Sequence, residues 1–594
     1  MSTPESAGAN SGLDASFVPS RGRALGANAA AGVTGRQPAG HALPSLIAGS
    51  PGTPGDHVRA ALAVSPLASL VNAAVPPTAK ALISETIRDP AAMVLRRRTA
   101  IAAFRAVAVK LAPYRKKWSE NLPPGSPARA LNLPLLHILV KRNGYVDSSI
   151  VDDMALGMPI AGEIGVTGAL KPRERPAETT LEEWTRGVPE RNKEVIDRVG
   201  RFRNSTMGPE CWEKTRKEID DGWLTHPVPL TPVIAESICL SPRFAIPEYR
   251  GAGQRKVRII DDLRASGVNA VTSMRDTAVP DSLDCVLALE VYFRLASPGC
   301  VLKAASTDFC HAYKTIGIAP GQERFSAVLL GPPHGPLLVS HLKTQPFGST
   351  RAPGNWGRVT ALSQWILTTY FHVHLPIYVD DCFVIELAET IESAVNCVHT
   401  LAELCGFRLD KDQAPAESIV MLGAQVTFTA EGVSAALLEN KRDILVTDLE
   451  KIIEAGTLTP GQAAKMRGRL GFAQGLMFGK FGRVQMQPFT NRQYSRALKG
   501  PHLLNGELRE VIPWWVHVLR NIAPRQTMMP GPKPVLVYCD AAGCGHLGVV
   551  IFVDGVSHVF SSHAPEWMMV AECGIYDFEM VAALGRGWFE SFKF

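Results

Sequence analysis

The chain has 594 residues, of which 62 are Lys or Arg and 56 are Asp or Glu, so its formal charge is +6. Hydrophobic residues make up 46% of it, which permits a packed core and excludes wholesale disorder, and the length predicts roughly three to five domains. No run of about 18 apolar residues is free of charges and breakers, and no apolar core follows basic residues at the start, so we expect neither a membrane span nor a secretory signal. The 11 cysteines include no C-x-x-C pair, which disfavours a disulfide framework and a zinc site. An intracellular protein of the cytoplasm or nucleus is expected.

The first 240 residues carry no motif that states a function. Residues 1–56 are rich in Ala, Gly, Pro and Ser, and we expect a disordered tail there, with a transit peptide as the alternative. Residues 57–240 form a helical and mixed region of unknown role. Within it, the basic and apolar stretch 91–118 predicts a helix that lies against phosphates or a membrane surface, or one that only presents a solvated face. Pro and Gly residues at 123–127 predict a break after this helix.

Short apolar runs alternate with helical patterns from about residue 241 onwards. Helices are expected over 356–369 and 386–405. The strand candidates are 257–260, 301–305, 327–330, 337–342, 376–385 and 419–428. Strands mixed with helices in this order predict an α+β domain.

Charge is distributed unevenly along the second half of the chain. Residues 371–460 contain 15 acidic and 5 basic residues, whereas residues 461–530 contain 11 basic and 2 acidic residues. A basic segment of helical texture is suited to tracking a phosphate backbone. The net charge is small because the negative charge of the first segment and the positive charge of the second nearly cancel.

Two adjacent carboxylates, Asp380 and Asp381, are flanked on both sides by apolar residues. This pattern predicts a β-hairpin over 376–385 with the two acids at its tip. Bringing two anions together costs free energy unless a cation neutralises them, and oxygen ligands suit Mg²⁺. The alternative is an ordinary solvated turn, in which Asp is common.

Two segments upstream supply a context for this pair. A predicted strand leads to Asp308, with Tyr313 five residues later, so Asp308 can complete a two-metal site. Residues 345–353 read Gln-Pro-Phe-Gly-Ser-Thr-Arg-Ala-Pro. In this segment Gly348 permits a close approach of the backbone, and Ala352-Pro353 is expected to begin a helix.

The order Asp-x4-Tyr, then Gln-Pro-Phe-Gly-x3-Ala-Pro, then Tyr-Val-Asp-Asp resembles the palm of reverse transcriptases. Upstream, residues 256–264 followed by Asn269 resemble the fingers motif of the same enzymes. The resemblance covers about residues 240–430 and implies a right-hand polymerase, with fingers and palm over 241–430. Its motif contexts are more similar to LTR or tyrosine-recombinase retrotransposons than to non-LTR elements.

Residues 406–409 and 421–423 resemble the segments that follow the catalytic hairpin in this family. The lysine expected in this downstream motif corresponds to Lys411, which lies just after the first segment and is flanked by Asp410 and Asp412. This part of the resemblance is looser than the palm motifs.

The resemblance assigns a role to each residue of the acidic site. Asp308 and Asp380, supported by Asp381, would hold two Mg²⁺ ions, with Mn²⁺ as the alternative ion. Tyr313 would lie under the sugar of the incoming nucleotide and exclude a 2′-hydroxyl group. The alternative for Tyr313 is a core aromatic residue.

The resemblance also assigns residues to the nucleotide itself. Lys256 and Arg258 would bind the triphosphate, for which a fork of donors is well suited, and Lys256 is a solvated strand residue in the alternative interpretation. Gln345, Phe347 and Gly348 would line the nucleotide and template pocket.

Residues 431–530 fit the thumb and connection that follow a polymerase palm. Pro460 is expected to begin a helix that Thr459 caps. The basic residues expected to face a duplex are Lys465, Arg467, Arg469, Lys480 and Arg483. In the alternative interpretation each of them is a solvated charge.

A second resemblance lies in residues 533–594. Residues 535–543 are predicted to form a buried strand that contains Asp540, 548–553 its hairpin partner, and 576–584 a helix that bears Glu579. Asp540 and Glu579 resemble the first two carboxylates of ribonuclease H domains, whereas the third and fourth acids of that family have no counterpart in this sequence. We therefore expect a partial ribonuclease H-like domain without nuclease activity, from a truncated or decayed copy, with an unrelated α/β fragment as the alternative.

These patterns together predict an RNA-directed DNA polymerase of a retroelement. Its partners would be an RNA or DNA template with a primer, and deoxynucleoside triphosphates. One alternative is a catalytically silent remnant that binds nucleic acid through residues 461–530. Another is a polymerase that copies DNA or needs no template.

Overall fold

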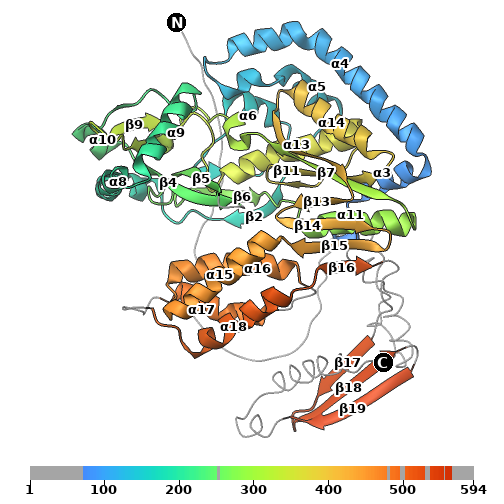
Figure 1. Ribbon diagram of the computed structural model, residues 1–594. Coiled ribbons are helices and arrows are strands. Elements are labelled where there is room, and N and C mark those ends of the chain that lie inside the picture. The colour runs from blue at the N-terminus through green and yellow to red at the C-terminus, as the bar shows by residue number, and fades with distance from the viewer. Residues whose placement is uncertain are drawn as a thin grey trace, which may run out of the picture. The chain divides into compact units, whose positions relative to one another are not determined.

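The computed structural model describes residues 71–250, 254–477, 482–495, 502–528, 536–553 and 556–564. The tail expected over 1–56, the basic residue Lys480 and the acid Glu579 lie outside these residues. The chain is built of mixed helices and strands, and the α+β class is confirmed (Figure 1). Among the helices described, none combines the length and the apolar character needed to cross a membrane.

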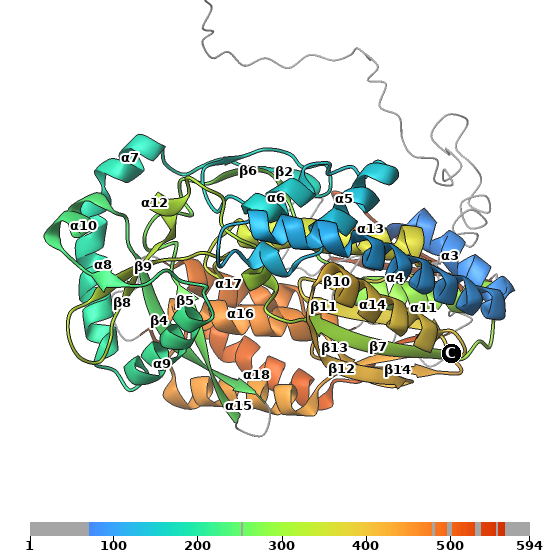
Figure 2. The same cartoon turned by 90° about the horizontal axis from the view of Figure 1, so that it is seen from above.

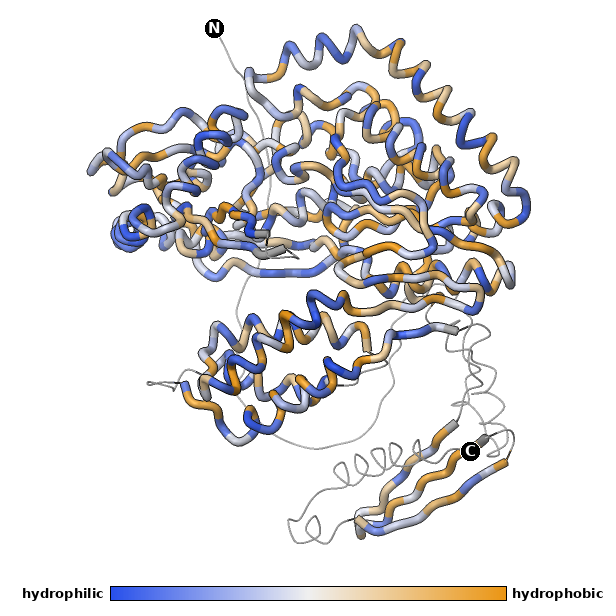
Figure 3. Tube along the Cα trace, viewed as in Figure 1, coloured by the Kyte–Doolittle hydropathy of each residue, from blue (hydrophilic) through white to orange (hydrophobic). Residues whose placement is uncertain are grey.

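A group of helices precedes the first sheet. It comprises α3 (Pro77–Arg88), α4 (Pro90–Asn121), the 3₁₀ helix η1 (Pro127–Ala130), α5 (Leu133–Arg142) and α6 (Ile150–Leu156). The helix predicted over 91–118 is α4, and it ends before the predicted Pro and Gly break. Hydrophilic residues recur along α4 (Figure 3), while one side packs on α14 (Ile391–Cys405). On that side Arg97 is buried and its Nη2 lies 2.6 Å from Oε1 of Glu386, so this part of the stretch belongs to the core.

Two sheets lie in the next part of the chain. The larger has the order β3-β9-β8-β4-β5, with β3 (Val228–Pro229), β4 (Ser241–Arg250), β5 (Gln254–Asp261), β8 (Ala327–Leu330) and β9 (Leu338–His341). The smaller has the order β1-β6-β2, with β1 (Glu163–Ile164), β2 (Lys171–Arg175) and β6 (Ser273–Thr277). The helices of this part are α7 (Leu181–Arg186), α8 (Val188–Arg203), α9 (Gly208–Asp220), α10 (Pro232–Ser237) and α12 (Glu323–Ser326).

A four-stranded sheet with the order β10-β11-β7-β12 carries the acidic residues. Its strands are β7 (Leu302–Phe309), β10 (Ile377–Tyr378), β11 (Asp381–Leu387) and β12 (Leu409–Ala416). The helices beside it are α11 (Leu283–Ala296), η2 (Ala312–Thr315), α13 (Ala352–Tyr370) and α14, and Figure 2 shows α13 and α14 near β10, β11 and β7.

This sheet is buried on both faces because successive side chains of a strand point to opposite sides. Ala304 and Phe383 belong to a core that also contains residues of α11, whereas Ala305 and Val384 belong to a core with residues of α13 and α14. Two covered faces explain why every residue of β7 except Lys303 is buried and why β11 contains the buried apolar run 382–385 directly after Asp381.

A second four-stranded sheet has the order β13-β14-β15-β16, with β13 (Ser418–Met421), β14 (Ala424–Thr429), β15 (Gly432–Leu437) and β16 (Arg525–Met528). The prediction of one strand over 419–428 is wrong, since the segment is a hairpin. Leu422 and Gly423 have φ values of 49° and 82°, and two consecutive left-handed residues turn the chain back on itself.

The basic segment is helical, as predicted. Its helices, together with the one before it, are α15 (Glu439–Ala455), α16 (Pro460–Gly475), η3 (Val484–Met486), α17 (Gln487–Tyr494) and α18 (Gly506–Asn521) (Figure 1). Thr459 caps α16 through a reciprocal capping box with Gln462, which confirms the predicted start. Leu470 and Trp515 are fully buried in the same core as β14 and β15.

Two other predicted boundaries can be compared with the structure. The helix expected to begin at Ala352-Pro353 is α13 and does begin there. The helix expected over 386–405 begins only at Ile391, because Glu386 and Leu387 complete β11 by pairing with Lys303 and Leu302 of β7.

A three-stranded antiparallel sheet closes the described chain, with β17 (Leu536–Ala541), β18 (His546–Val553) and β19 (Val556–His563). The predicted hairpin of β17 and β18 is confirmed. The prediction that β17 is buried is wrong for Tyr538, Cys539 and Asp540, which are exposed. The apolar side chains buried in this sheet come mainly from β18, among them Val549 and Ile551.

Candidate active site

The hairpin of β10 and β11 brings the paired acids next to the end of β7. In the register of the sheet, Asp381 lies directly opposite Asp308. The backbone N–H of Phe309 also donates to the carbonyl O of Asp380 over 2.9 Å. The predicted hairpin tip is therefore confirmed, and three carboxylates meet at one end of the sheet.

The turn between the strands is held in an unusual backbone conformation. Val379 has a φ of 57°, a region that costs a β-branched residue about 1–3 kcal/mol. The indole Nε1–H of Trp356, a buried residue of α13, donates to the carbonyl O of Val379 over 2.6 Å. Tertiary contacts therefore stabilise a turn that the local sequence disfavours.

The three carboxylates form a compact anionic cluster. One oxygen from each of Asp308, Asp380 and Asp381 lies within 4.8 Å of the other two. Burial, and then the charges of Asp308 and Asp381, raise the pKa of Asp380 to about 6. Burial and the charge of Asp308 also raise the pKa of Asp381. A bound cation would relieve this crowding, and a set of carboxylate oxygens suits Mg²⁺ or Mn²⁺.

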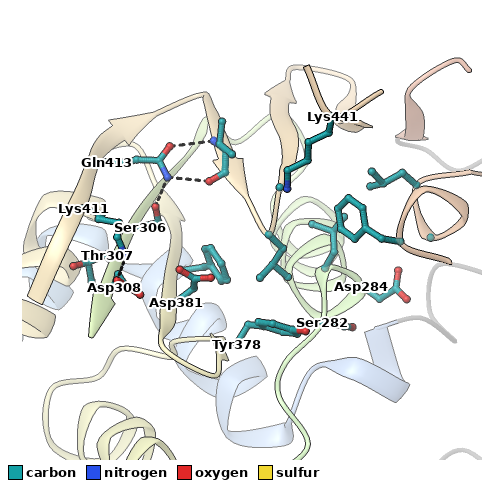
Figure 4. Close-up of a pocket in the computed structure, with 18 of the residues that line it drawn as sticks. Ser282, Asp284, Ser306, Thr307, Asp308, Tyr378, Asp381, Lys411, Gln413 and Lys441 are labelled. Atoms are coloured by element: carbon teal, nitrogen blue, oxygen red, sulfur yellow. Dashed lines mark hydrogen bonds and ion pairs between the residues drawn. The ribbon is translucent and has the colours of Figure 1, made fainter. Parts of the chain in front are cut away.

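Lys411 supplies a cationic group beside the cluster. Its Nζ donates to Oδ2 of Asp308, as Figure 4 shows. The carboxylates of Asp308, Asp380 and Asp381 raise the pKa of Lys411, although partial burial opposes them. In the register of the sheet the flanking Asp410 pairs with Asp308, and Lys411 follows at an irregularity of β12 with a φ of 56°, from which its side chain reaches Asp308.

An aromatic pair lies next to the carboxylates. The rings of Tyr313 and Phe347 have centroids 5.0 Å apart, and the guanidinium of Arg258 lies 5.9 Å from the centre of the Phe347 ring. Burial, and then the charge of Asp380, raise the pKa of Tyr313 to about 12, so its hydroxyl stays neutral. Tyr313 is buried and Phe347 is exposed, so the pair forms a wall with one accessible ring.

The predicted phosphate-binding residues lie on one exposed face of β5. Lys256 and Arg258 are two positions apart and exposed, while Val257 between them is buried. Arg258 pairs with Glu248 of β4 over 3.6 Å, and this pair is partly exposed. The structure thus brings Arg258 to the aromatic pair and leaves Lys256 further along the strand.

Gln345 lies in the interior, where both polar atoms of its side chain are hydrogen-bonded to other protein groups. Its Nε2 donates to the carbonyl O atoms of Met158 and Gly317 over 2.9 and 3.0 Å, and its Oε1 accepts from Nδ2 of Asn355 over 2.9 Å. The side chain is fully buried. The side chain therefore holds together the segments around the site. The resemblance implied that Gln345 lines the nucleotide pocket, whereas its buried position points to this structural role.

Gly348 lies against the end of β5, where a Cβ atom would be 1.7 Å from the carbonyl O of Asp261. Nδ2 of Asn269 donates to the carbonyl O of Gly348 over 2.9 Å, and Oδ1 of Asn269 accepts from the N–H of Thr350 over 3.0 Å. The close approach expected of Gly348 is therefore real, and it joins the Phe347 turn to β5.

A cavity of about 780 Å³ adjoins the carboxylates. Asp308, Asp381 and Tyr378 line one part of it, while Lys441 of α15 lines another (Figure 4). Phe472 of α16 also lines the cavity. Nζ of Lys441 lies 5.4 Å from the centre of the Phe472 ring. Sequence reasoning missed these two residues, because nothing in their local pattern distinguishes them from other helix residues.

The basic residues expected to face a duplex differ in their surroundings. Lys465 and Arg483 are exposed. Arg467 lies 5.9 Å from the centre of the Tyr494 ring, and Arg469 forms an ion pair with Asp448 of α15. Of these four, Lys465 and Arg483 are the charges that the described residues leave most accessible.

Asp540 lies on β17, opposite Gly548 of β18, and its side chain is exposed. Its expected partner Glu579 lies outside the described residues. Among the residues described, the only group of three or more acidic, His or Cys ligands that converge is the cluster of Asp308, Asp380 and Asp381.

Comparisons with known proteins give matches only among solved structures, since neither a protein-family model nor a curated protein matches the chain. The chain is similar to a foamy viral protease-reverse transcriptase, designated dRH, in complex with double-stranded DNA (13% identity, TM-score 0.39, covering 70% of this chain and 74% of that chain). It is also similar to a foamy viral protease-reverse transcriptase in complex with an RNA/DNA hybrid (12% identity, TM-score 0.39, covering 78% of this chain and 56% of that chain). At these TM-scores the similarity does not carry a functional conclusion, which has to come from the site.

Proposed function

We propose that this chain is a nucleotidyltransferase of the reverse-transcriptase type, which extends a primer on an RNA template with deoxynucleoside triphosphates. The observation that carries the proposal is the convergence of Asp308, Asp380 and Asp381 within 4.8 Å at one end of the sheet. The order of the motifs that contain these acids supports the same reaction. An origin in an LTR or tyrosine-recombinase retroelement belongs to the proposal as well.

The three carboxylates would hold two Mg²⁺ ions, or Mn²⁺ in their place. When bound, such ions activate a primer 3′-hydroxyl group and neutralise charge on the leaving pyrophosphate. Asp308 and Asp380 would hold these ions, and Asp381 would support them. Lys411 at Asp308 keeps one positive charge beside the cluster.

The residues around the cluster would position the nucleotide. Arg258, and Lys256 on the same face of β5, would donate to triphosphate oxygens. Tyr313, fixed by its packing on Phe347, would contact the sugar where a ribonucleotide carries its 2′-hydroxyl group. Phosphoryl transfer depends mainly on positioning and electrostatic stabilisation, so this set of groups is sufficient for the reaction.

A primer-extension assay with Mg²⁺ on an RNA template tests the proposal, with the same primer on a DNA template beside it. Wild-type protein should extend the primer, and Asp380→Asn should lose extension at least about a thousandfold, because one oxygen ligand is replaced by an amide. Template binding, measured by fluorescence anisotropy, should stay within about twofold of wild type for both proteins.

Asp412→Asn is the matched control, since Asp412 lies beside Lys411 on β12 but is exposed and lies 3.7 Å from Nε2 of His399. This variant should extend the primer normally. Template binding without extension by the wild-type chain would contradict the proposal and favour a silent nucleic-acid-binding protein. Extension on DNA templates alone would instead indicate a DNA-copying polymerase.

A further inference from the structure

The catalytic hairpin has one strand at the edge of its sheet. β10 is the first strand in the order β10-β11-β7-β12 and contains only Ile377 and Tyr378. An edge strand has backbone groups that no neighbouring strand satisfies. In β10 these groups belong to Ile377, and a residue from outside the sheet binds both of them.

That residue is Asp281, which lies between β6 and α11. The backbone N–H of Asp281 donates to the carbonyl O of Ile377 over 3.0 Å, and Oδ2 of Asp281 accepts from the N–H of Ile377 over 2.9 Å. Asp281 therefore holds the edge strand in the manner of a short additional strand, three residues before Asp380.

Gln364 of α13 joins this contact to the helix behind the hairpin. Its Nε2 donates to the carbonyl O of Leu375 over 2.7 Å and to Oδ2 of Asp281 over 3.3 Å. Asp281 and Gln364 are both partly buried. The strand that leads into the acidic turn is thus fixed to two separate elements.

The hairpin separates this contact from the carboxylates. Ile377 and Val379 line a small cavity of about 210 Å³ together with Asp281 and Gln364. Tyr378, Asp308 and Asp381 line the larger cavity of about 780 Å³. Since alternate side chains of a strand point to opposite faces, Asp281 and Gln364 act on the hairpin from the face away from the carboxylates.

We infer that Asp281 and Gln364 are positioning residues that set where Asp380 and Asp381 stand relative to Asp308. The inference rests on the proposed function, in which these acids hold divalent ions. The turn needs such support because Val379 has a φ of 57°, which L residues with branched side chains disfavour. The hydrogen bonds of Asp281 to the backbone edge of Ile377 prevent the turn from relaxing away from β7.

The important property of Asp281 is its acceptor oxygen. Burial raises the pKa of its carboxyl group, whereas the hydrogen bonds from Ile377 and Gln364 oppose that rise. Asparagine retains an oxygen that can accept from the N–H of Ile377, and alanine does not. Asp281→Asn and Asp281→Ala therefore separate the loss of the charge from the loss of the hydrogen bond.

The test is calorimetric titration of the full chain with Mn²⁺ in the absence of nucleic acid, together with the Mg²⁺ dependence of primer extension. For Asp281→Ala we expect Mn²⁺ affinity to fall at least about fivefold and the Mg²⁺ concentration for half-maximal extension to rise by a similar factor, because misplaced ligands bind an ion more weakly. In Asp281→Ala the KM for deoxynucleotide should change less than twofold. In Asp281→Asn the Mn²⁺ affinity and the Mg²⁺ concentration for half-maximal extension should also each change less than twofold.

Thr360→Ala is the matched control. Thr360 lines the same small cavity from the same helix as Gln364, but its hydroxyl donates only to the carbonyl O of Gly357 over 3.1 Å. This variant should behave as wild type. Should Asp281→Ala fail to fold, as judged by circular dichroism, Gln364→Met removes the hydrogen bonds to Leu375 and Asp281 at similar side-chain size and should weaken Mn²⁺ binding at least about twofold.

The inference would be overturned if Asp281→Ala bound Mn²⁺ as tightly as the wild type. It would also be overturned if Asp281→Ala and Asp281→Asn lost Mn²⁺ affinity equally. If the wild-type chain binds Mn²⁺ but extends no primer, and Asp281→Ala still weakens Mn²⁺ binding, the polymerase proposal fails and the positioning role stands. Absence of Mn²⁺ binding in the wild-type chain would overturn both.

Discussion

Gly348 and Asp261 approach each other so closely that a Cβ atom on Gly348 would lie 1.7 Å from the backbone O of Asp261. The obstacle is main chain, and Asp261 is itself fixed by Arg243, whose Nε and Nη2 donate to its carboxylate over 2.7 and 3.0 Å. A shift of either Gly348 or Asp261 would therefore cost free energy. This contact holds the Phe347 turn against the strand that carries Arg258.

Gly348→Ala should therefore lower the free energy of unfolding by about 1–3 kcal/mol or more, because the added methyl group overpacks a rigid site. Urea denaturation followed by circular dichroism measures the change. Gly468→Ala is the control, since Gly468 lies within α16 with open space around it and should gain roughly 0.5–1 kcal/mol. If the Gly348→Ala variant and the wild type were equally stable, the close packing of Gly348 against the main chain of Asp261 would be contradicted.

Tyr313→Ala should weaken the discrimination against ribonucleotides. The ring packs on Phe347 at 5.0 Å and is fixed beside Asp380, so removing it opens the space next to the sugar. We expect the ratio of ribonucleotide to deoxynucleotide incorporation to rise at least about tenfold, equivalent to about 1.4 kcal/mol. Single-nucleotide insertion kinetics measure this ratio.

Tyr313→Phe is the matched control for that experiment. It keeps the ring and removes only a hydroxyl group that stays neutral at working pH, since its pKa is raised to about 12. Discrimination should stay within about twofold of wild type. A rise as large as that of Tyr313→Ala would show that the hydroxyl, and not the ring, is responsible.

Asp380→Asn should stabilise the metal-free chain above about pH 6. The pKa of Asp380 is raised to about 6, above an unfolded value of about 3.9, so the folded chain binds more protons than the unfolded chain between these values. The contribution of this group to stability is then lost as the pH rises from about 4 to about 6. The asparagine variant cannot ionise and avoids the loss.

Thermal unfolding in the presence of EDTA, from about pH 4 to about pH 7.5, measures this effect. The Tm of Asp380→Asn minus that of wild type should increase with pH, and Mg²⁺ at about pH 7.5 should raise the Tm of wild type more than that of the variant. Asp412→Asn, at a carboxylate outside the cluster, is the control. Parallel pH curves for wild type and Asp380→Asn would contradict the crowding of the three acids.

Lys465→Gln should reduce the salt dependence of duplex binding. Lys465 is exposed on α16, so its loss should lower the slope of log Kd against log salt by about one. Arg469→Gln should have a smaller effect, because Arg469 already pairs with Asp448. Anisotropy titrations from about 50 to about 200 mM KCl compare the variants. A larger change in slope for Arg469→Gln would contradict this assignment.

Local patterns in the sequence determined much of the acidic site. The apolar runs around Asp380 and Asp381 specify a hairpin, and the run before Asp308 specifies a strand. These patterns can be identified from the sequence because they are formed by residues that follow one another in the chain. The start of α13 at Ala352 and the cap of α16 at Thr459 are equally local, since they depend on proline geometry and on a hydroxyl three residues from its partner.

Only the tertiary structure decided which of these residues meet. The pairing of Asp381 with Asp308, the placement of Lys411 at that acid, and the contact of Asp281 with Ile377 join segments far apart in sequence. No local pattern encodes such distances, because they depend on how sheets and helices pack. The burial of Gln345 and the cavity position of Lys441 follow from the same packing. The sequence by itself therefore determined the acidic residues and the strands that present them, whereas packing between distant segments decided their common geometry.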